Sequence, residues 1–267
     1  MHFYGLFGEH LSHSLSPLLH RSIYQKTGLQ ASYKTFAFPP AELSEAVASI
    51  RTLTISGVNV TIPYKETVLP FLDELDPLAR QLQAVNTIKN QAGHLIGYNT
   101  DYAGFGLIFE RRKWSPAGKT AVVLGTGGAA KMVIAYLLHQ GIQHITIVSR
   151  SPERFESTDK TTYTNYTSAS TLQGDFLINT TPVGMYPDTA DTPVSEGMIQ
   201  HFGILIDLVY NPSITTFLSL GRKHAKETAN GLDMLIGQAV RAVEIWENLE
   251  IDSSVIEELI QEFGEKR

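Results

Sequence analysis

Cysteine is absent from the 267 residues, which excludes a disulfide framework, a cysteine–zinc site and a thiol nucleophile. No window approaches about 18 uninterrupted apolar residues, and the first residues lack the basic start and apolar core of a signal peptide. Positive charge is scarce as well, because 21 Lys and Arg face 27 Asp and Glu, for a formal net charge of −6. This balance disfavours nucleic-acid binding, and together these absences predict a soluble cytoplasmic protein.

What is present is a repeated alternation of short apolar strands and helical stretches, which is typical of an α/β fold. The length favours about two domains, and the apolar content of 43% is enough for ordinary cores. We expect a boundary near residue 101, after a first domain with a mainly parallel sheet. The expected strands are 3–7, 33–38, 57–61, 85–89 and 94–98 in the first part, and 120–124, 144–148, 176–179 and 203–207 in the second.

The helices are predicted from spacing and from residues that start or stop them. The expected helices are 16–26, 42–50, 68–72, 101–112, 129–139 and 234–249, with a further helix near the C-terminus. Ser16 is interpreted as an N-cap followed by Pro17, and Ser254 with Glu257 fits a capping box. The Ser- and Thr-rich segment 157–170 is expected to be a surface loop.

A glycine-rich turn follows the apolar strand 120–124 and precedes a helix. Gly125, Gly127 and Ala130 match the pattern G-x-G-x-x-A, in which the first glycine makes the turn and the second admits a pyrophosphate. The helix N-terminus then presents free N–H groups to the anion. The motif predicts a Rossmann-type dinucleotide-binding domain, and the alternative is a glycine turn of purely structural use.

The end of the next strand indicates which dinucleotide is bound. About 20 residues after the glycines, an NAD-binding domain carries an acidic residue for the ribose 2′-hydroxyl. This chain has Ser149 and Arg150 there, with Arg154 close by. Since arginine pairs with a 2′-phosphate in bidentate fashion, NADP is favoured over NAD. Alternatively, the two arginines only solvate a loop.

Polar residues at strand ends and a strand–helix junction are the candidates for catalysis. The Ser14 and Ser16 hydroxyls are placed to hold a carboxylate at a helix N-terminus, although simple capping explains them too. Lys65 follows a buried strand and Thr61, and a desolvated lysine there can transfer a proton; a surface lysine is the alternative. Asn86 lies at another strand end.

Two further candidates lie on predicted helices. Asp101 begins the helix 101–112, where it is either a site residue or an N-cap. Gln238 shares a helix face with Met234, and its amide needs a partner among apolar neighbours. A substrate hydroxyl and a helix-packing hydrogen bond both remain open as that partner. No cluster with metal-ligand spacing is visible among the nine histidines.

The motifs along the chain, taken together and in sequence order, resemble those of the shikimate dehydrogenase family over nearly the full length. The matching segments share the family's order and spacing, and they are Ser14–Pro17, Asn59–Lys65, Ala84–Thr87, Asn99–Asp101, Gly125–Ala129, Asn179–Met185, Asp207–Pro212 and Gly231–Leu235. The chain departs from the usual family pattern at Thr126, Ser149, Leu208 and Ala130.

The resemblance implies reversible, NADPH-dependent reduction of 3-dehydroshikimate to shikimate in the pathway to chorismate and the aromatic amino acids. It implies that a substrate domain, residues 1–101, is completed by C-terminal helices 238–267, and that residues 102–237 form the NADP-binding domain. Lys65 and Asp101 would be the catalytic pair. Alternatives are a quinate/shikimate dehydrogenase that accepts NAD and a non-catalytic ligand sensor.

The resemblance also implies individual ligand contacts and the binding partners. The expected substrate-binding residues are Ser14, Ser16, Thr61, Asn86, Tyr210 and Gln238. The expected cofactor-binding residues are Gly125, Thr126, Gly127, Gly128, Ala129, Ser149, Arg150, Arg154, Thr180, Leu208, Gly231 and Met234. A small molecule is therefore the expected partner, with no metal and no membrane; a monomer and a homodimer both remain open.

Overall fold

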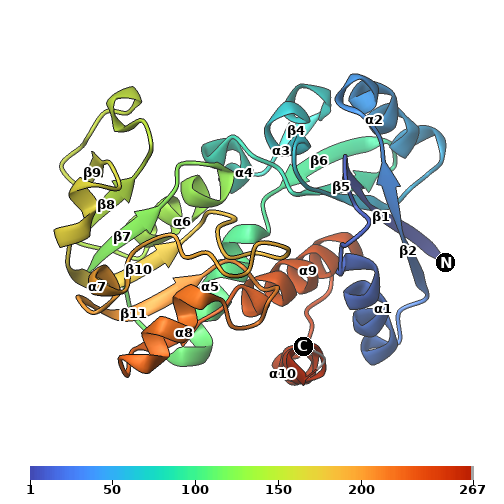
Figure 1. Cartoon of the computed structure of the whole chain (residues 1–267). Helices are drawn as coiled ribbons and strands as arrows, with labels where there is room; N and C mark the ends of the chain where they lie inside the picture. Colours follow the sequence, from blue (N-terminus) through green and yellow to red (C-terminus); the bar gives the residue numbers. More distant parts are fainter. Residues whose placement is uncertain (266–267) are drawn as a thin grey trace. The chain divides into compact units, whose positions relative to one another are not determined.

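The structure is a computed structural model that describes residues 1–265. The chain divides into two α/β units, and each contains a six-stranded sheet. The first unit comprises Met1–Gly104 and Leu235–Glu262, and the second comprises Phe105–Met234 with the chain from Phe263 onward. The predicted α/β class with two parallel-rich sheets is confirmed (Figure 1).

The first unit contains a mixed sheet with the strand order β2-β1-β3-β5-β6-β4. Three of its five pairings are parallel, and β5 is antiparallel to both of its neighbours. The strands of this sheet are β1 His2–Gly8, β2 Ala31–Ala37, β3 Gly57–Val60, β4 Glu74–Leu75, β5 Thr87–Gln91 and β6 His94–Tyr98. The carboxyl end of β3 and the loops on either side of β5 and β6 carry the predicted site residues.

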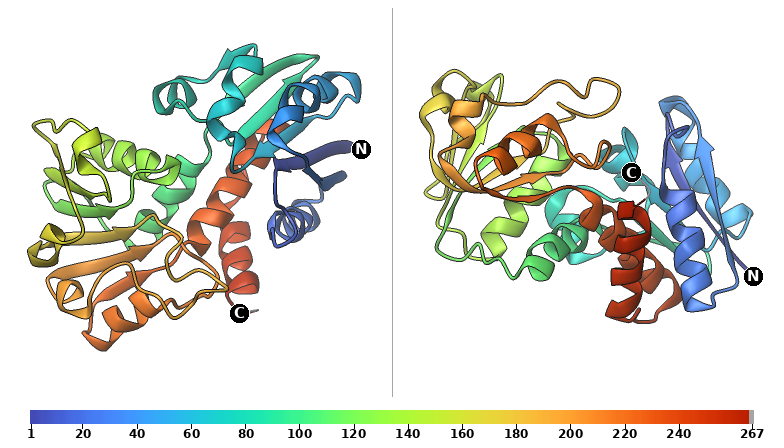
Figure 2. Two further views of the ribbon diagram at one scale, coloured as in Figure 1. Left: turned by 45° about the horizontal axis from the view of Figure 1, so that its top comes forward. Right: turned by 60° about the horizontal axis from the view of Figure 1, so that its bottom comes forward.

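Helices cover both faces of the first sheet. On one face, Tyr4 of β1 stacks on Trp246 at a ring distance of 4.4 Å, while on the other Phe7 packs with Val47 and Ile50. The helices of this unit are α1 Ser16–Thr27, α2 Leu43–Thr52, α3 Tyr64–Thr67, α4 Pro77–Leu82, most of α9 Leu232–Glu247 and α10 Ser253–Glu265, with 3₁₀ turns at Pro40–Glu42 and Leu69–Phe71. Figure 2 shows α10 beside α1, where Ser22 donates to Glu262 over 2.6 Å.

The second unit contains an entirely parallel sheet with the order β12-β11-β10-β7-β8-β9. Numbered within the unit and read from β9, this is the order 3-2-1-4-5-6 of a dinucleotide-binding sheet, which reverses between β7 and β10. Its strands are β7 Thr120–Leu124, β8 His144–Val148, β9 Thr161–Thr164, β10 Gly174–Asn179, β11 Phe202–Asp207 and β12 Glu227–Ala229. Its helices are α5 Asp101–Arg112, which starts in the first unit, α6 Gly128–His139, α7 Glu196–Ile199 and α8 Thr216–Lys223, with 3₁₀ turns at Pro152–Arg154 and Ser168–Thr171.

Two predicted helix caps are wrong. Helix α1 already includes Ser16, so Leu15 is the capping position and no side chain caps the helix. Instead, Ser14 Oγ accepts from the backbone N–H of Ser16 over 3.3 Å. At the C-terminal helix, Asp252 Oδ1 accepts from the N–H of Ser254 over 2.8 Å, so Asp252 supplies the cap that was assigned to Ser254.

Two predicted segments also differ from the structure. The expected helix 68–72 is a short α3 followed by a 3₁₀ turn, because Pro70 cannot donate a helical hydrogen bond. The expected loop 157–170 contains β9, in which threonines form an edge strand parallel to β8. Across residues 1–265, the structure has no helix long and apolar enough to cross a membrane.

Candidate active site

Lys65, Asp101 and Asn86 form a polar cluster in the first unit. Lys65 lies on α3, one short turn beyond β3, and Asp101 is the first residue of α5, just after β6. Lys65 Nζ donates to Asp101 Oδ2 over 2.6 Å, and Asn86 Nδ2 donates to Asp101 Oδ1 over 2.9 Å. The lysine side chain is 30% exposed and the carboxylate 14%, so a partly desolvated ammonium is held where a ligand can reach it.

Buried backbone and side-chain bonds fix this cluster. Asn86 is 3% exposed, and its Oδ1 accepts from the N–H of Thr100 over 2.7 Å. The Lys65 carbonyl accepts from the N–H of Val85 over 2.8 Å, which ties α3 to the segment before β5. Asp101 therefore lies at the start of a helix that Asn86 anchors through the preceding residue, Thr100.

Three residues without a predicted role also belong to this cluster, namely Asn59, Thr87 and Thr100. All three are buried, with exposures of 5%, 0% and 1%. Asn59 Nδ2 donates to Thr87 Oγ1 over 3.0 Å, and the Thr87 and Thr100 hydroxyl oxygens are 3.2 Å apart. The available signal was the run of polar residues in otherwise apolar strands, because buried polar groups need partners.

The remaining predicted substrate residues of the first unit are half-buried. Thr61 follows β3, and its N–H donates to Phe7 O over 2.9 Å. Ser14 and Ser16 lie at the start of α1. Gln238 Nε2 donates to Leu235 O one turn earlier on α9, over 2.9 Å, so its amide is satisfied within its own helix.

The glycine-rich turn joins β7 to α6 in the second unit. Gly125 has φ +108°, a left-handed conformation, and a Cβ there would lie 2.8 Å from Thr180 Oγ1. Gly127 precedes α6 without a side-chain cap, and space is open around Gly127 and Gly128. The first N–H groups of a three-turn helix are therefore accessible to an anion, as a dinucleotide phosphate requires.

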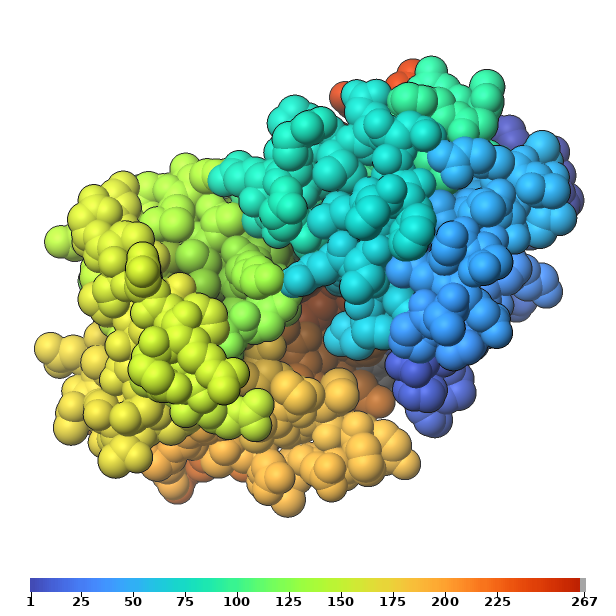
Figure 3. Space-filling model, turned by 90° about the horizontal axis from the view of Figure 1, so that it is seen from above, coloured from blue at the N-terminus to red at the C-terminus, as the bar shows by residue number. Residues whose placement is uncertain are grey.

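The residues after β8 are arranged around a buried serine and two exposed arginines. Ser149 is 6% exposed, and its Oγ accepts from the N–H of Ser151 over 3.1 Å. Arg150 and Arg154 are exposed, and Figure 3 shows this yellow-green part of the second unit at the surface. Exposed guanidinium groups near the glycine-rich turn suit a cofactor with an additional phosphate.

A buried carboxylate at the end of β11 anchors the loop that contains Leu208, a predicted cofactor residue. Asp207 ends β11, is 0% exposed, and accepts from Thr215 Oγ1 over 2.6 Å, Asn179 Nδ2 over 2.9 Å and the N–H of Val209 over 3.1 Å. Burial is the main effect and raises the pKa of Asp207 to about 6, while the three hydrogen bonds act in the opposite direction. These bonds fix the loop that begins at Leu208.

The other predicted cofactor residues surround that loop and the glycine turn. Thr180 Oγ1 donates to Leu124 O over 2.6 Å, at the end of β7. A Cβ at Gly231 would overlap the backbone carbonyl of Leu208, so only glycine fits at this crossing. Tyr210 lies in the loop after β11, and Met234 lies on the first turn of α9.

No group of three or more metal-ligating side chains is assembled within residues 1–265. Taken together, the first unit carries an ammonium–carboxylate pair among buried polar groups. The second carries an anion-accepting helix N-terminus at the point where its strand order reverses. The first unit therefore suits proton transfer, and the second suits the binding of a dinucleotide.

Comparison with known proteins identifies the family that has these features. Residues 6–88 match the model of the shikimate dehydrogenase substrate binding domain, residues 109–177 that of shikimate / quinate 5-dehydrogenase, and residues 231–261 that of the shikimate 5′-dehydrogenase C-terminal domain. Shikimate dehydrogenase (NADP(+)) of Clostridium beijerinckii is 44% identical over 265 residues, with 98% of each chain covered. Relatives between 38% and 44% identical carry the same name, which does not favour the NAD-dependent quinate alternative.

Solved structures agree with this similarity. Shikimate dehydrogenase 1 from Peptoclostridium difficile has a TM-score of 0.90 and 41% identity, with 100% of this chain and 99% of that chain covered. The Thermus thermophilus enzyme, solved with NADP(H) and shikimate, has a TM-score of 0.87 and 30% identity, with 98% and 100% covered. The resemblance read from the motifs is thus confirmed, and the chain belongs to the family of NADP-dependent shikimate dehydrogenases.

Proposed function

We propose that Lys65 and Asp101 carry out the proton transfer in this NADP-dependent shikimate dehydrogenase, which interconverts 3-dehydroshikimate and shikimate. The observation that supports the proposal is the 2.6 Å ion pair between them. One carboxylate oxygen of Asp101 receives the lysine and the other receives Asn86, so the ammonium has a fixed direction. A flexible surface lysine would lack this constraint.

The chemistry of carbonyl reduction explains these residue types. Bound NADPH supplies the hydride. Negative charge develops on the substrate oxygen, where the Lys65 ammonium stabilises it and donates a proton to complete the hydroxyl group. In the reverse direction the neutral amine of Lys65 takes the hydroxyl proton, while Asp101 keeps the side chain oriented.

The remaining polar residues bind the substrate in this proposal. Ser14 and Ser16, with Tyr210, bind the substrate carboxylate through hydroxyl groups. Thr61, Asn86, Asp101 and Gln238 bind the ring hydroxyl groups. Support comes from the partial burial of Thr61 and from the Lys65 side chain, which is 30% exposed.

The cofactor is assigned to the second unit. The turn Gly125–Ala129 and the N-terminus of α6 bind the pyrophosphate, because this backbone is open and uncapped. Ser149, Arg150 and Arg154 bind the 2′-phosphate. Thr180, Leu208, Gly231 and Met234 complete the pocket.

These assignments give each domain one ligand. Residues 1–101 with 238–267 form the substrate domain, and residues 102–237 form the NADP domain. The protein acts in the cytoplasm as a monomer or a homodimer. It binds no nucleic acid, in keeping with its net charge of −6.

Lys65→Ala tests the catalytic assignment, with Lys34→Ala as the matched control on exposed strand β2. We expect Lys65→Ala to lower kcat for shikimate oxidation by about 10²- to 10⁴-fold, as for loss of a general acid–base group. Its KM for shikimate should stay within about fivefold of wild type. The absorbance of reduced nicotinamide measures both, and Lys34→Ala should match wild type.

The opposite pattern would remove the assignment. If Lys65→Ala weakened shikimate binding but left kcat unchanged, the lysine would be a ligand for the ground state only.

A further inference from the structure

A continuous chain of hydrogen bonds connects Tyr33 on β2 to the Lys65–Asp101 pair. The Tyr33 hydroxyl donates to Asn59 Oδ1 over 2.7 Å. Asn59 Nδ2 then donates to Thr87 Oγ1 over 3.0 Å, and Thr87 Oγ1 donates to Asn86 Oδ1 over 3.2 Å. Asn86 closes the chain on the Asp101 carboxylate.

Backbone groups determine the direction of this chain. The N–H of Thr100 can only donate, and it lies 2.7 Å from Asn86 Oδ1, so Asn86 must turn its NH₂ group toward Asp101. The carbonyl of Asn86 can only accept, and it lies 3.3 Å from Asn59 Nδ2, so Asn59 must turn its oxygen toward Tyr33.

With both amides fixed, the four bonds from Tyr33 to Asp101 run in one direction, toward the carboxylate, when the Thr87 hydroxyl donates to Asn86 and not to Thr100. Hydrogen bonds aligned in one direction polarise one another, and here the chain ends on a negative charge. Its middle members are almost fully buried, so water does not replace a missing group. An interruption anywhere along the chain therefore changes how firmly Asn86 and Asp101 are held.

We propose that Tyr33 and Thr87 are positioning residues for the reaction: their hydroxyl groups orient Asn59 and Asn86, which in turn fix Asp101 and Lys65. This inference rests on the proposed catalytic roles of Lys65 and Asp101. Neither Tyr33 nor Thr87 touches the pair directly. Thr87 acts through Asn86, and Tyr33 acts through Asn59.

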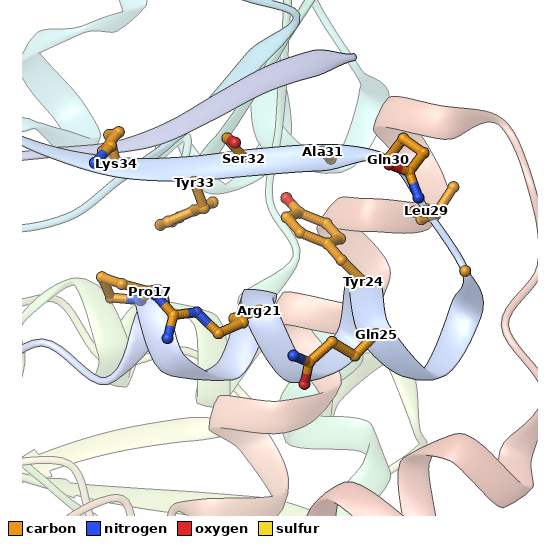
Figure 4. A pocket seen from close by; sticks show the side chains of 11 residues that line it. Pro17, Arg21, Tyr24, Gln25, Leu29, Gln30, Ala31, Ser32, Tyr33 and Lys34 are labelled. Atoms are coloured by element: carbon orange, nitrogen blue, oxygen red, sulfur yellow. The ribbon is translucent and has the colours of Figure 1, made fainter.

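The surroundings of Tyr33 allow its hydroxyl to be tested apart from its ring. Figure 4 shows Tyr33 and Tyr24 between β2 and α1, in the wall of a surface cavity. The Tyr33 ring stacks on His20 at 3.9 Å, which holds the ring in place when the hydroxyl is removed. Tyr24 is 5% exposed, and its hydroxyl has no hydrogen-bond partner among the described residues, so Tyr24→Phe is the matched control.

The first experiment measures shikimate oxidation by Thr87→Val, Thr87→Ser, Tyr33→Phe and Tyr24→Phe. We expect Thr87→Val to lower kcat about tenfold and Tyr33→Phe about threefold, because a misplaced catalytic pair costs rate more than ground-state affinity. KM for shikimate and for NADP should change by less than about threefold. Thr87→Ser, which keeps the hydroxyl, should restore most of the rate, and Tyr24→Phe should match wild type.

A second readout shows whether Thr87 acts through Asn86. In an Asn86→Ala background, Thr87→Val should change kcat by less than about twofold, since the link between Thr87 and Asp101 is already broken. Thermal midpoints recorded alongside separate a loss of stability from a loss of rate.

The possible outcomes separate this inference from the proposed function. If Lys65→Ala is inactive while Thr87→Val and Tyr33→Phe keep wild-type kcat, only the positioning role is overturned, whatever happens to the thermal midpoint. An equal loss of rate in Thr87→Val and Thr87→Ser would also overturn it, because the hydroxyl would not be responsible. If Lys65→Ala keeps wild-type turnover, the proposed roles are wrong and the positioning role falls with them.

Discussion

At the scale of single residues, Asp207 shows how a buried carboxylate affects stability without taking part in proton transfer. Its pKa is raised to about 6 from an ordinary value of 3.8, mainly by burial. The folded protein therefore holds this proton more tightly than the unfolded chain does. The resulting stabilisation is complete below about pH 4 and is lost as the pH rises through 6.

We compare the free energy of unfolding of Asp207→Asn with that of wild type. The difference in favour of the variant should be up to about 3 kcal/mol larger at pH 7 than at pH 4. The amide oxygen can accept from Asn179 and Val209, and its NH₂ group can donate to the Thr215 hydroxyl, so the cluster stays bonded. Urea unfolding of both proteins between pH 4 and 7 measures the change.

The test uses the difference in unfolding free energy between the two proteins, because His20 changes the stability of each protein with pH in the opposite direction. Burial lowers the pKa of His20 to about 4, so its contribution to stability is present above about pH 6.5 and is lost as the pH falls through 4. His20 is common to both proteins and cancels. A stability difference that stays flat between pH 4 and 7 would contradict the raised pKa of Asp207.

The residues proposed to transfer the proton were easier to predict from the sequence than the residues proposed to position them. Lys65 and Asp101 are visible as polar residues beside strand ends, and the motif order suggested that they act together. Tyr33 and Thr87 were not predictable in the same way. They are 54 residues apart in the sequence, and both hydrogen-bond Asn59. A threonine in a strand is ordinary, and only the tertiary structure shows that this one is 0% exposed and hydrogen-bonded.

At the scale of elements, the start of α9 depends on a close backbone crossing. A side chain at Gly231 would overlap the carbonyl of Leu208, and the N–H of Gly231 donates to Val209 O over 3.2 Å. Both contacts join the turn before α9 to the loop after β11. Because the obstacle is backbone, it cannot rotate away as a side chain would.

Gly231→Ala should therefore lower the free energy of unfolding by about 2 kcal/mol, as overpacking does, and should also weaken NADP binding. Gly197→Ala is the matched control in the same unit, since a Cβ there meets only Ser195 Oγ at 4.0 Å and the position is helical. That variant should be neutral or slightly stabilised. Denaturant unfolding and cofactor titration measure the two effects; equal stability of both variants would mean that the crossing relaxes freely.

In the second unit, the strands buried on both faces were predictable, whereas the edge strands β9 and β12 were not. The apolar runs of β7, β8, β10 and β11 identified the centre of the second sheet. Strand β9 is only partly buried, and its threonines are as typical of a loop as of a strand. The Ser16 cap was misplaced by one residue for a similar reason, since a serine beside proline suits both the cap and the first turn.

At the scale of the whole molecule, two helices belong to both units. Helix α5 passes from the first unit to the second after Gly104, and α9 returns after Met234. Within the second unit, Asp233 on α9 accepts from Arg111 over 3.0 Å and also from Arg112, both at the end of α5. Asp233 is 3% exposed, so replacing the arginines would leave a buried negative charge uncompensated.

We expect this continuity to make the units unfold together, so a ligand that binds one unit should stabilise both. Each unit contains one of the two tryptophans, Trp114 in the second unit and Trp246 in the first, so each can report on the unfolding of its own unit. In a Trp114→Phe variant, Trp246 alone reports on the first unit, from its stack on Tyr4. NADP⁺ at about 100 times its Kd contributes about 2.7 kcal/mol, which should raise the Trp246 midpoint by roughly 5 to 10 °C.

Calorimetry on the wild type provides the control, and it should show one transition that shifts by the same amount. If the cofactor moved a calorimetric transition but left the Trp246 midpoint in place, the units would unfold separately. The ion pairs of Asp233 would then stabilise the second unit only. Helices α5 and α9 would unfold on one side of the boundary between the units and stay folded on the other. Matching shifts would instead mean that the stability of the first unit, which contains Lys65 and Asp101, depends on cofactor binding to the second unit.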